Sequence, residues 1–124
     1  MLLPTTALRV FAYTRTTDMR KSFDGLCGLV EQELGQQVES GHLFLFFNRR
    51  HNRVKVLYFV GDGLVIFYRR LERGTFEVPR TVTVGDDKTT GVELRWSDLA
   101  LILEGIELSS VRRRKRWTRP AQPA

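Results

Sequence analysis

Apolar residues in the first third of the chain recur at the spacing of a helix. The stripe comprises Phe23, Leu26, Cys27, Val30 and Leu34. This spacing of three or four positions predicts a helix from about Met19 to Leu34. Asp18 precedes it as a good N-cap, and Gly35 follows where a left-handed C-terminal cap is expected.

The middle of the chain has the pattern of strands. Three apolar runs cover residues 43–48, 53–60 and 64–70, and the pieces NRRHN and GDG between them are typical of turns. The run Leu43–Phe47 is apolar on both faces, so we expect it in the middle of a sheet. Further strand-like runs cover residues 8–14, 80–84 and 92–96.

Together these elements predict an α+β fold. We expect a small antiparallel sheet of about five or six strands, packed with the longer N-terminal helix and with a short C-terminal helix that begins at Ser97 and ends at Gly105. One domain is expected over residues 1–108. After it the apolar pattern stops, so residues 109–124 are expected to be a basic, disordered tail.

Positive charge is concentrated in two parts of the sequence. The net charge is +6, and the six Lys and Arg residues of the tail account for it, so residues 1–108 are neutral as a whole. Within that neutral part, residues 49–80 hold eight Lys and Arg against three acids. Segregation of this kind indicates a polyanionic partner.

The first basic group surrounds the predicted turn after Asn48. Arg49, Arg50, Arg53 and Lys55 crowd around its tip, and the adjoining ribbon adds three more arginines, which are Arg69, Arg70 and Arg73. A two-stranded ribbon fits a DNA groove, and the arginine fork matches phosphates and guanine edges. The alternative is that these charges only keep a hairpin tip in solvent.

The second basic group is the tail, in which an aromatic residue lies among cations. Its members are Arg112, Arg113, Arg114, Lys115, Arg116, Trp117 and Arg119. Such a mixture suits phosphate contact and base stacking. Its alternatives are a solubilising end or an acidic protein partner. Phosphate contacts carry no sequence information, so the tail would add affinity without selecting a DNA sequence.

Residues that could support catalysis or metal binding are few. The chain has two histidines and one cysteine, without any zinc-binding spacing or nucleophile motif. We therefore expect no enzyme, no metal and no cofactor. A magnesium-dependent nuclease using Asp18, Asp62 and Glu72 is the least favoured alternative, because two-metal chemistry needs converging carboxylates. The single cysteine and the short apolar runs predict a cytoplasmic protein without membrane contact.

Three stretches of the sequence together resemble a known family. They are TDMRKSFDGL (17–26), GHLFLFFNRRHNRVKVLYFVGDGLVIFYRRLERGTFEVP (41–79) and LALILEGIEL (99–108). They are similar to the accessory transposition protein, the second open reading frame product, of the insertion-sequence sixty-six family. The resemblance covers most of residues 9–108. It implies a protein of a bacterial mobile element that assists a separate, larger transposase.

The resemblance adds residues to the candidate site and partners to the expected function. Arg20 and Lys21 match the family pattern and would open the first helix, where cations are unfavourable, which suggests pairing with Glu72 or with phosphate. Gly63 and Gly74 are expected in turns. Phe23 and Phe76 are expected in the core.

The candidate nucleic-acid-binding residues are Arg20, Lys21, Arg49, Arg50, Arg53, Lys55, Arg69, Arg70, Arg73, Arg112, Arg113, Arg114, Lys115, Arg116, Trp117 and Arg119. The expected partners are the DNA of transposon ends and the transposase, and the expected location is the bacterial nucleoid. The alternative is an adaptor that binds the transposase without DNA contact. Its candidate surface is an aromatic face that comprises Tyr58, Phe59, Phe67 and Trp96.

Overall fold

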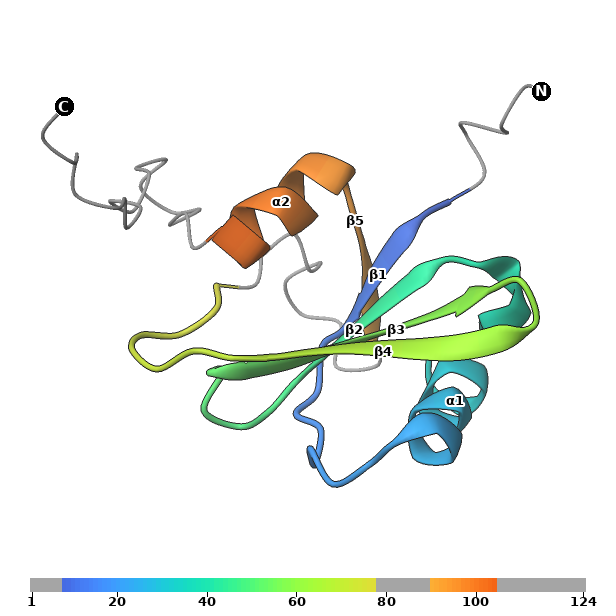
Figure 1. Cartoon of the computed structure of the whole chain (residues 1–124), viewed down its shortest axis with the longest axis horizontal. Coiled ribbons are helices and arrows are strands. Elements are labelled where there is room, and N and C mark those ends of the chain that lie inside the picture. Colours follow the sequence, from blue (N-terminus) through green and yellow to red (C-terminus); the bar gives the residue numbers. More distant parts are fainter. Residues whose placement is uncertain (1–7, 78–89, 105–124) are drawn as a thin grey trace, which may run out of the picture.

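The computed structural model describes residues 8–77 and 90–104, and a five-stranded sheet lies at its centre (Figure 1). The strands are β1 (Val10–Tyr13), β2 (Leu43–Phe47), β3 (Arg53–Val60), β4 (Gly63–Arg70) and β5 (Gly91–Leu94). Their order across the sheet is β4-β3-β2-β1-β5. The apolar run that forms β2 is therefore central, as its composition predicts, and four of its five residues are buried.

The chain reaches β2 from β1 by a crossover. Helix α1 (Phe23–Gln32) and a 3-10 turn, η1 (Val38–Ser40), form this connection, and β1 and β2 are parallel. The other neighbours are antiparallel. The predicted α+β fold with a five-stranded sheet is thus confirmed. The one difference is the parallel pair, because a helix between two neighbouring strands allows the second to run in the same direction as the first.

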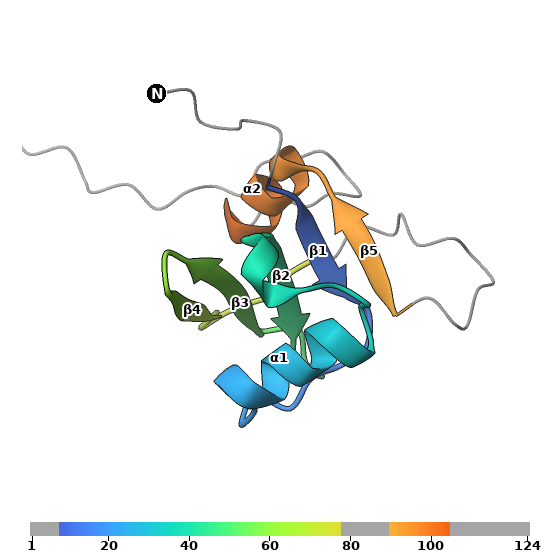
Figure 2. The ribbon, with the colours of Figure 1, turned by 90° about the vertical axis from the view of Figure 1, so that its right-hand side faces the viewer.

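The two faces of the sheet carry two separate cores, each covered by one helix (Figure 2). Side chains alternate between the faces along each strand. The core under α1 includes Phe11, Leu26, Val30, Phe44, Phe46 and Leu57. The core under α2 (Trp96–Glu104) includes Val10, Leu45, Val54, Val56, Leu99 and Ile102. Burying apolar side chains of this size contributes about 1.5–3 kcal/mol each, before the entropy cost of ordering them.

Helix α1 is shorter than its apolar stripe predicts. It begins at Phe23, and Asp18 does not cap it: the Asp18 carboxylate accepts the Arg20 backbone N–H at 2.9 Å and so forms a separate turn. Phe23 is 43% exposed and the prediction that it lies in the core is wrong. Gly35, by contrast, ends the helix region with φ +62°, as predicted.

Arg20 and Lys21 consequently precede α1 and do not open it, because the turn made by Asp18 occupies this segment. Their position therefore carries no helix-dipole cost. The expected pairing with Glu72 is also wrong, because Arg20 pairs with Asp18 and Glu72 pairs with Arg70.

Helix α2 begins one residue before the predicted cap Ser97. Asp98, the third helical residue, accepts the backbone N–H of Arg95 at 3.0 Å and so satisfies a donor at the helix start. The Arg95 guanidinium also donates to this carboxylate and holds the pKa of Asp98 below its usual value. An acid in the first turn thus replaces the expected hydroxyl cap.

Several predicted features lie outside the described residues. They are the strand over 80–84, the end of the second helix at Gly105 and the tail 109–124. Within the described ranges, no helix is long and apolar enough to cross a membrane.

Candidate nucleic-acid interface

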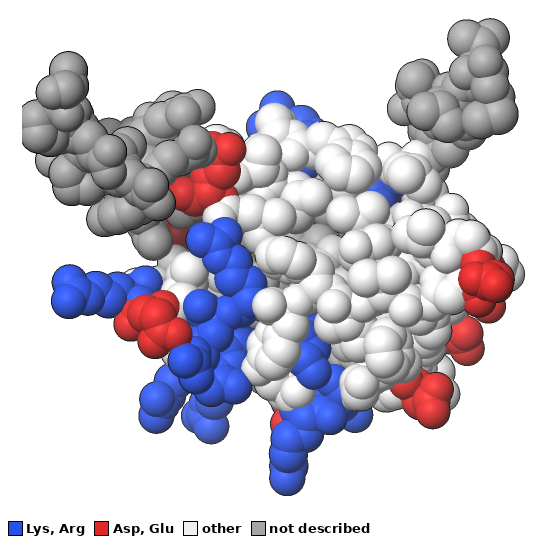
Figure 3. Space-filling model, viewed as in Figure 1, with Lys and Arg blue, Asp and Glu red and all other residues white. Residues whose placement is uncertain are grey.

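Positive side chains gather at the end of the sheet where β2 turns into β3 (Figure 3). We call this region the basic end. It comprises the turn 48–52, the adjoining ends of β3 and β4, and the segment 71–77 that follows β4. Its arginines are Arg49, Arg50, Arg53, Arg69, Arg70 and Arg73, and its acids are Glu72 and Glu77. The β3–β4 turn with Asp62 lies at the opposite end of those strands.

The turn at the basic end is fixed by Asn48. Its side-chain oxygen accepts the backbone N–H groups of Asn52 and Arg53 at 3.0 and 2.9 Å, and its amide donates to the Asn52 side chain at 2.7 Å. Asn side chains commonly replace backbone groups in turns in this way. Arg49 and Arg50 lie between these anchors, are exposed, and make no ion pair within the described residues.

A second set of contacts joins the turn to the segment after β4. The Phe76 N–H donates to the His51 carbonyl at 2.6 Å, and the Leu71 N–H donates to the Asn52 carbonyl at 2.8 Å. Phe76 is 3% exposed, which confirms its predicted place in the core, and Phe47 contacts both its ring and that of His51. These contacts hold Arg49, Arg50 and Arg73 on one stiff scaffold.

Sequence reasoning missed the backbone role of His51. It has φ +56°, in the left-handed region that non-glycine residues seldom adopt. Asn and Asp are the usual signals for such a position, yet His51 adopts it and the adjacent Asn52 does not. Gly74 has φ +77° and makes the expected turn, whereas the left-handed residue of the β3–β4 turn is Gly61, not Gly63.

Arg53 and Arg70 lie side by side on the α1 face. They are register partners across β3 and β4. The Arg53 guanidinium donates to the Tyr68 hydroxyl at 2.9 Å, and Arg70 pairs with Glu72 at 2.8 Å. Tyr68, which sequence reasoning did not include in the site, thus positions Arg53. Like charges directly opposite each other are destabilising, which suggests that this pair has a task beyond folding.

Arg69 points to the other face, because its neighbour Arg70 faces α1 and side chains alternate. Its guanidinium donates to the backbone carbonyl of Leu103 in the last turn of α2. Arginines near a helix C-terminus satisfy free carbonyls and interact favourably with the helix dipole. Arg69 therefore ties α2 to β4 and does not share a surface with Arg53.

Lys55 is 7% exposed and is held inside the protein. Its ammonium donates to the backbone carbonyls of Met19 and Lys21, each at 2.8 Å, and lies 4.8 Å from the centre of the Tyr68 ring. A buried ammonium needs such acceptors to offset its lost hydration. Lys55 therefore fixes the segment before α1 against the sheet, and its ammonium is already occupied by these backbone acceptors.

Through this anchor Arg20 and Lys21 lie on the same face as Arg53. The Arg20 guanidinium pairs with Asp18 at 2.6 Å, and its hydrogen bonds hold the pKa of Asp18 at about 2, below the usual 3.8. Because the folded pKa is depressed, this pair stabilises the turn above about pH 4, and the contribution is lost as the pH falls through about 2. Both cations are exposed.

The carboxylates of the nuclease alternative do not converge. Asp18 is paired before α1, Glu72 is paired after β4, and Asp62 lies at the far turn of the β3–β4 hairpin. In the described part of the chain, no group of three His, Cys, Asp or Glu side chains could hold a metal ion.

The aromatic residues of the adaptor alternative do not form one face. Phe67 and Tyr58 lie on the α2 face of the sheet, and Phe59 lies on the α1 face. Trp96 is 51% exposed and its indole N–H donates to the Leu8 carbonyl at 3.0 Å. Of these four residues, Phe67, which is 44% exposed, is the one that leaves a large part of its ring open on the sheet itself.

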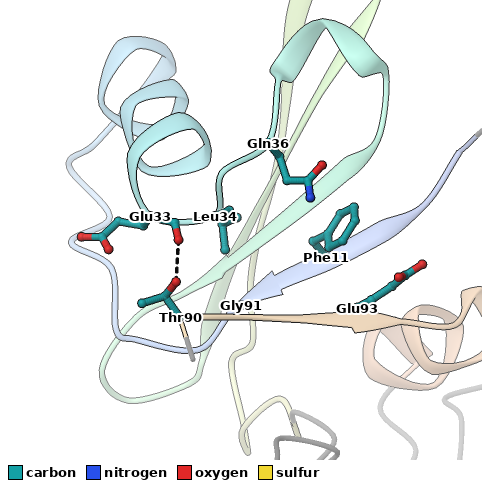
Figure 4. A pocket seen from close by; sticks show the side chains of 7 residues that line it. All are labelled: Phe11, Glu33, Leu34, Gln36, Thr90, Gly91 and Glu93. Atoms are coloured by element: carbon teal, nitrogen blue, oxygen red, sulfur yellow. Dashed lines mark hydrogen bonds between the residues drawn. The ribbon is translucent and has the colours of Figure 1, made fainter. Parts of the chain in front are cut away.

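A hollow of about 280 Å³ opens between the end of α1 and β5 (Figure 4). The Thr90 hydroxyl donates to the Glu33 carbonyl at 2.5 Å across it. Phe11 and Glu93 line its other side, and the Arg9 guanidinium holds the pKa of Glu93 below its usual value. Among the described residues, none of the candidate nucleic-acid-binding side chains lines this hollow.

The Asn48→Ala substitution tests whether the turn scaffold matters without changing any charge. Losing the side-chain hydrogen bonds of Asn48 should lower the free energy of unfolding by about 1–3 kcal/mol. Because Arg49 and Arg50 would lose their fixed positions, DNA affinity should fall as well. Urea unfolding and DNA titration check the two effects, and an unchanged stability would contradict the role given to Asn48.

Residues 8–113 match a protein family described as IS66 Orf2 like protein. Two proteins of Sinorhizobium fredii are similar. The uncharacterized protein y4jC is 28% identical over 98% of this chain and 100% of its own, and the uncharacterized protein y4hO is 31% identical over 81% and 82%. No solved structure matches.

Proposed function

Because the chain belongs to the IS66 Orf2-like family, whose members have an accessory role in transposition, we propose that it assists transposition by holding DNA at its basic end. The DNA-contacting residues are Arg20, Lys21, Arg49, Arg50, Arg53, Arg70 and Arg73. The cations of the tail, which lie outside the described residues, add affinity. The partners are the DNA of the element's ends and the separate transposase.

One observation carries this proposal: Arg53 and Arg70 face each other across two strands, beside a stiff turn that exposes Arg49 and Arg50. Repulsion within such a group costs folding free energy, and a phosphate backbone would relieve it. Arginine is well suited to this contact because its fork donates two parallel hydrogen bonds to one phosphate.

Phosphate contact limits the role of the protein in transposition to holding DNA. It fixes position and orientation on DNA and reads no base sequence directly. A rigid set of arginines that neither cleaves nor selects DNA would hold the duplex for the transposase, which supplies the chemistry. An accessory role of this kind needs no catalytic group in this chain.

Binding of the full chain to duplex DNA at low salt tests the proposal. We expect a shift in gel mobility for the wild type. A variant whose six tail cations are replaced by glutamine should bind more weakly, with a slope of log affinity against log salt that is smaller by about 5. Absence of any shift for both proteins would contradict DNA contact.

Recovery of the transposase from a pull-down separates DNA contact from the adaptor alternative. If the two proteins are joined through DNA, nuclease treatment should release the transposase. Retention after nuclease treatment would show direct protein contact, and it would favour the adaptor alternative if the gel assay also fails.

A further inference from the structure

Within residues 8–77 and 90–104, no strand pairs with the outer edge of β4. β4 is eight residues long and ends the sheet, and among the described residues only β3 pairs with it. It contributes no buried side chain, and Val65, Phe67 and Tyr68 are 37%, 44% and 46% exposed. The helices cover the inner strands, and the edge of β4 projects beyond them (Figure 2).

Open sheet edges are normally protected against pairing with other chains. Short strands, charges, prolines and bulges serve this purpose. β4 has none of them between Leu64 and Tyr68, a run of five apolar residues in regular register with β3. The other edge strand, β5, is only four residues long and carries Glu93 paired with Arg9. The difference indicates that β4 has a partner.

We propose that this partner is a second copy of the chain, paired antiparallel through β4 with the two-fold axis at Ile66. Residues i and 132 − i then face each other across the interface. Both copies keep the same face toward α1, so the two sheets join into one. This inference concerns the assembly and does not rest on DNA binding.

The main-chain groups of β4 fit this register. Val60 and Gly63 flank a two-residue turn, so they form a hydrogen-bonded pair, and such pairs alternate along an antiparallel ladder. The N–H and C=O groups of Gly63, Val65 and Phe67 therefore point toward β3. The N–H and C=O groups of Leu64, Ile66 and Tyr68 therefore point away from β3. With the axis at Ile66, these outward groups face the outward groups of the second copy and can bond to them.

The side chains favour this register over its neighbours. Arg70 meets Asp62 of the second copy, so the basic end of one chain lies beside the acidic turn of the other. Phe67 meets Val65 of the second copy on the α2 face, which covers two exposed apolar side chains in each chain. Opposite charges and aromatic–β-branched pairs at facing positions both stabilise strand pairing. A shift by two residues places Arg69 against Val65 and loses the charge pair.

Disulfide crosslinking in the full chain reads both the pairing and its register. Across the proposed interface, residue 65 of one copy and residue 67 of the other form a pair that exchanges no hydrogen bonds. The Cα atoms of such a pair are about 4.5 Å apart, which is within the range that a disulfide spans. The native thiol is removed by Cys27→Ala. In this background Val65→Cys and Phe67→Cys proteins are mixed and oxidised, and linked peptides are identified by mass spectrometry.

We expect a disulfide between position 65 of one chain and position 67 of the other. A 67–67 or 65–65 disulfide in its place would overturn the register. Absence of all three, with the folded state confirmed by circular dichroism, would overturn the pairing. The control is Glu93→Cys, an exposed position on β5 at the opposite edge of the sheet from β4, which should not link to either variant.

Light scattering over a range of concentrations provides a readout independent of cysteine chemistry. Edge pairing of a single strand buries less surface than most stable interfaces, so we expect a concentration-dependent monomer–dimer equilibrium. Asp62→Arg should weaken the dimer, and combining it with Arg70→Asp should restore it. A wild type that stays monomeric at every concentration, or a double variant as weak as the single one, would contradict the proposal.

Discussion

The Lys55→Met substitution should lower the free energy of unfolding by about 2–4 kcal/mol. The ammonium of Lys55 satisfies two backbone carbonyls, those of Met19 and Lys21, and only 7% of the residue is exposed. Leaving a buried acceptor without its donor costs about 1–3 kcal/mol. Methionine nearly matches lysine in length, so the loss comes mainly from the two unpaired carbonyls and not from a cavity.

Urea unfolding followed by circular dichroism measures this effect. The matched control is Arg50→Met, which removes the same charge from an exposed position and should change stability by less than about 0.5 kcal/mol. Equal effects of the two substitutions would mean that net charge, and not the anchor at Lys55, determines the stability.

Replacing Arg49, Arg50, Arg53 and Arg70 together by glutamine should remove most salt-dependent DNA binding by the folded part of the chain. Each phosphate contact contributes about 0.9 to the slope of log affinity against log salt, so the slope should fall by about 3–4. Between 50 and 200 mM salt the wild-type affinity should then decrease about 100-fold more than that of the variant. Fluorescence anisotropy with a labelled duplex measures both.

A pair of double variants controls for net charge. Arg49→Gln with Arg50→Gln removes two charges from the basic end. Arg9→Gln with Arg95→Gln removes two charges from the other end of the sheet, where β1 begins and β5 ends. Only the first pair should change the salt slope. If both change it equally, the protein binds DNA through its overall charge, and the geometry of the basic end has no special role.

The sequence predicted the features that depend on local pattern. A run such as Leu43–Phe47, apolar on both faces, is stable only between other strands, and it is indeed the central strand. Gly35 ends the first helix region because glycine adopts positive φ at little cost. Both follow from the chemistry of adjacent residues.

Features that depend on tertiary contacts could not be predicted. Lys55 lies between Val54 and Val56, so strand alternation places it on the opposite face, and nothing in the pattern shows that the segment before α1 covers it. Arg69 and Arg70 differ by one position, yet one ties α2 to the sheet and the other faces Arg53. Asp side chains are common both at helix N-caps and in turns, so the sequence does not distinguish the two roles for Asp18. The hydrogen bond from the Arg20 backbone N–H to its carboxylate places Asp18 in a turn.

The bond between Arg69 and the Leu103 carbonyl has a consequence for the last part of the chain. It fixes the end of α2 beside β4, one residue from Arg70 along the strand. Arg112 is eight residues beyond Glu104, and covalent geometry limits their separation to about 28 Å. A single duplex held by Arg53 and Arg70 would therefore meet the terminal cations at a high effective concentration, because a short linker joins the two basic groups.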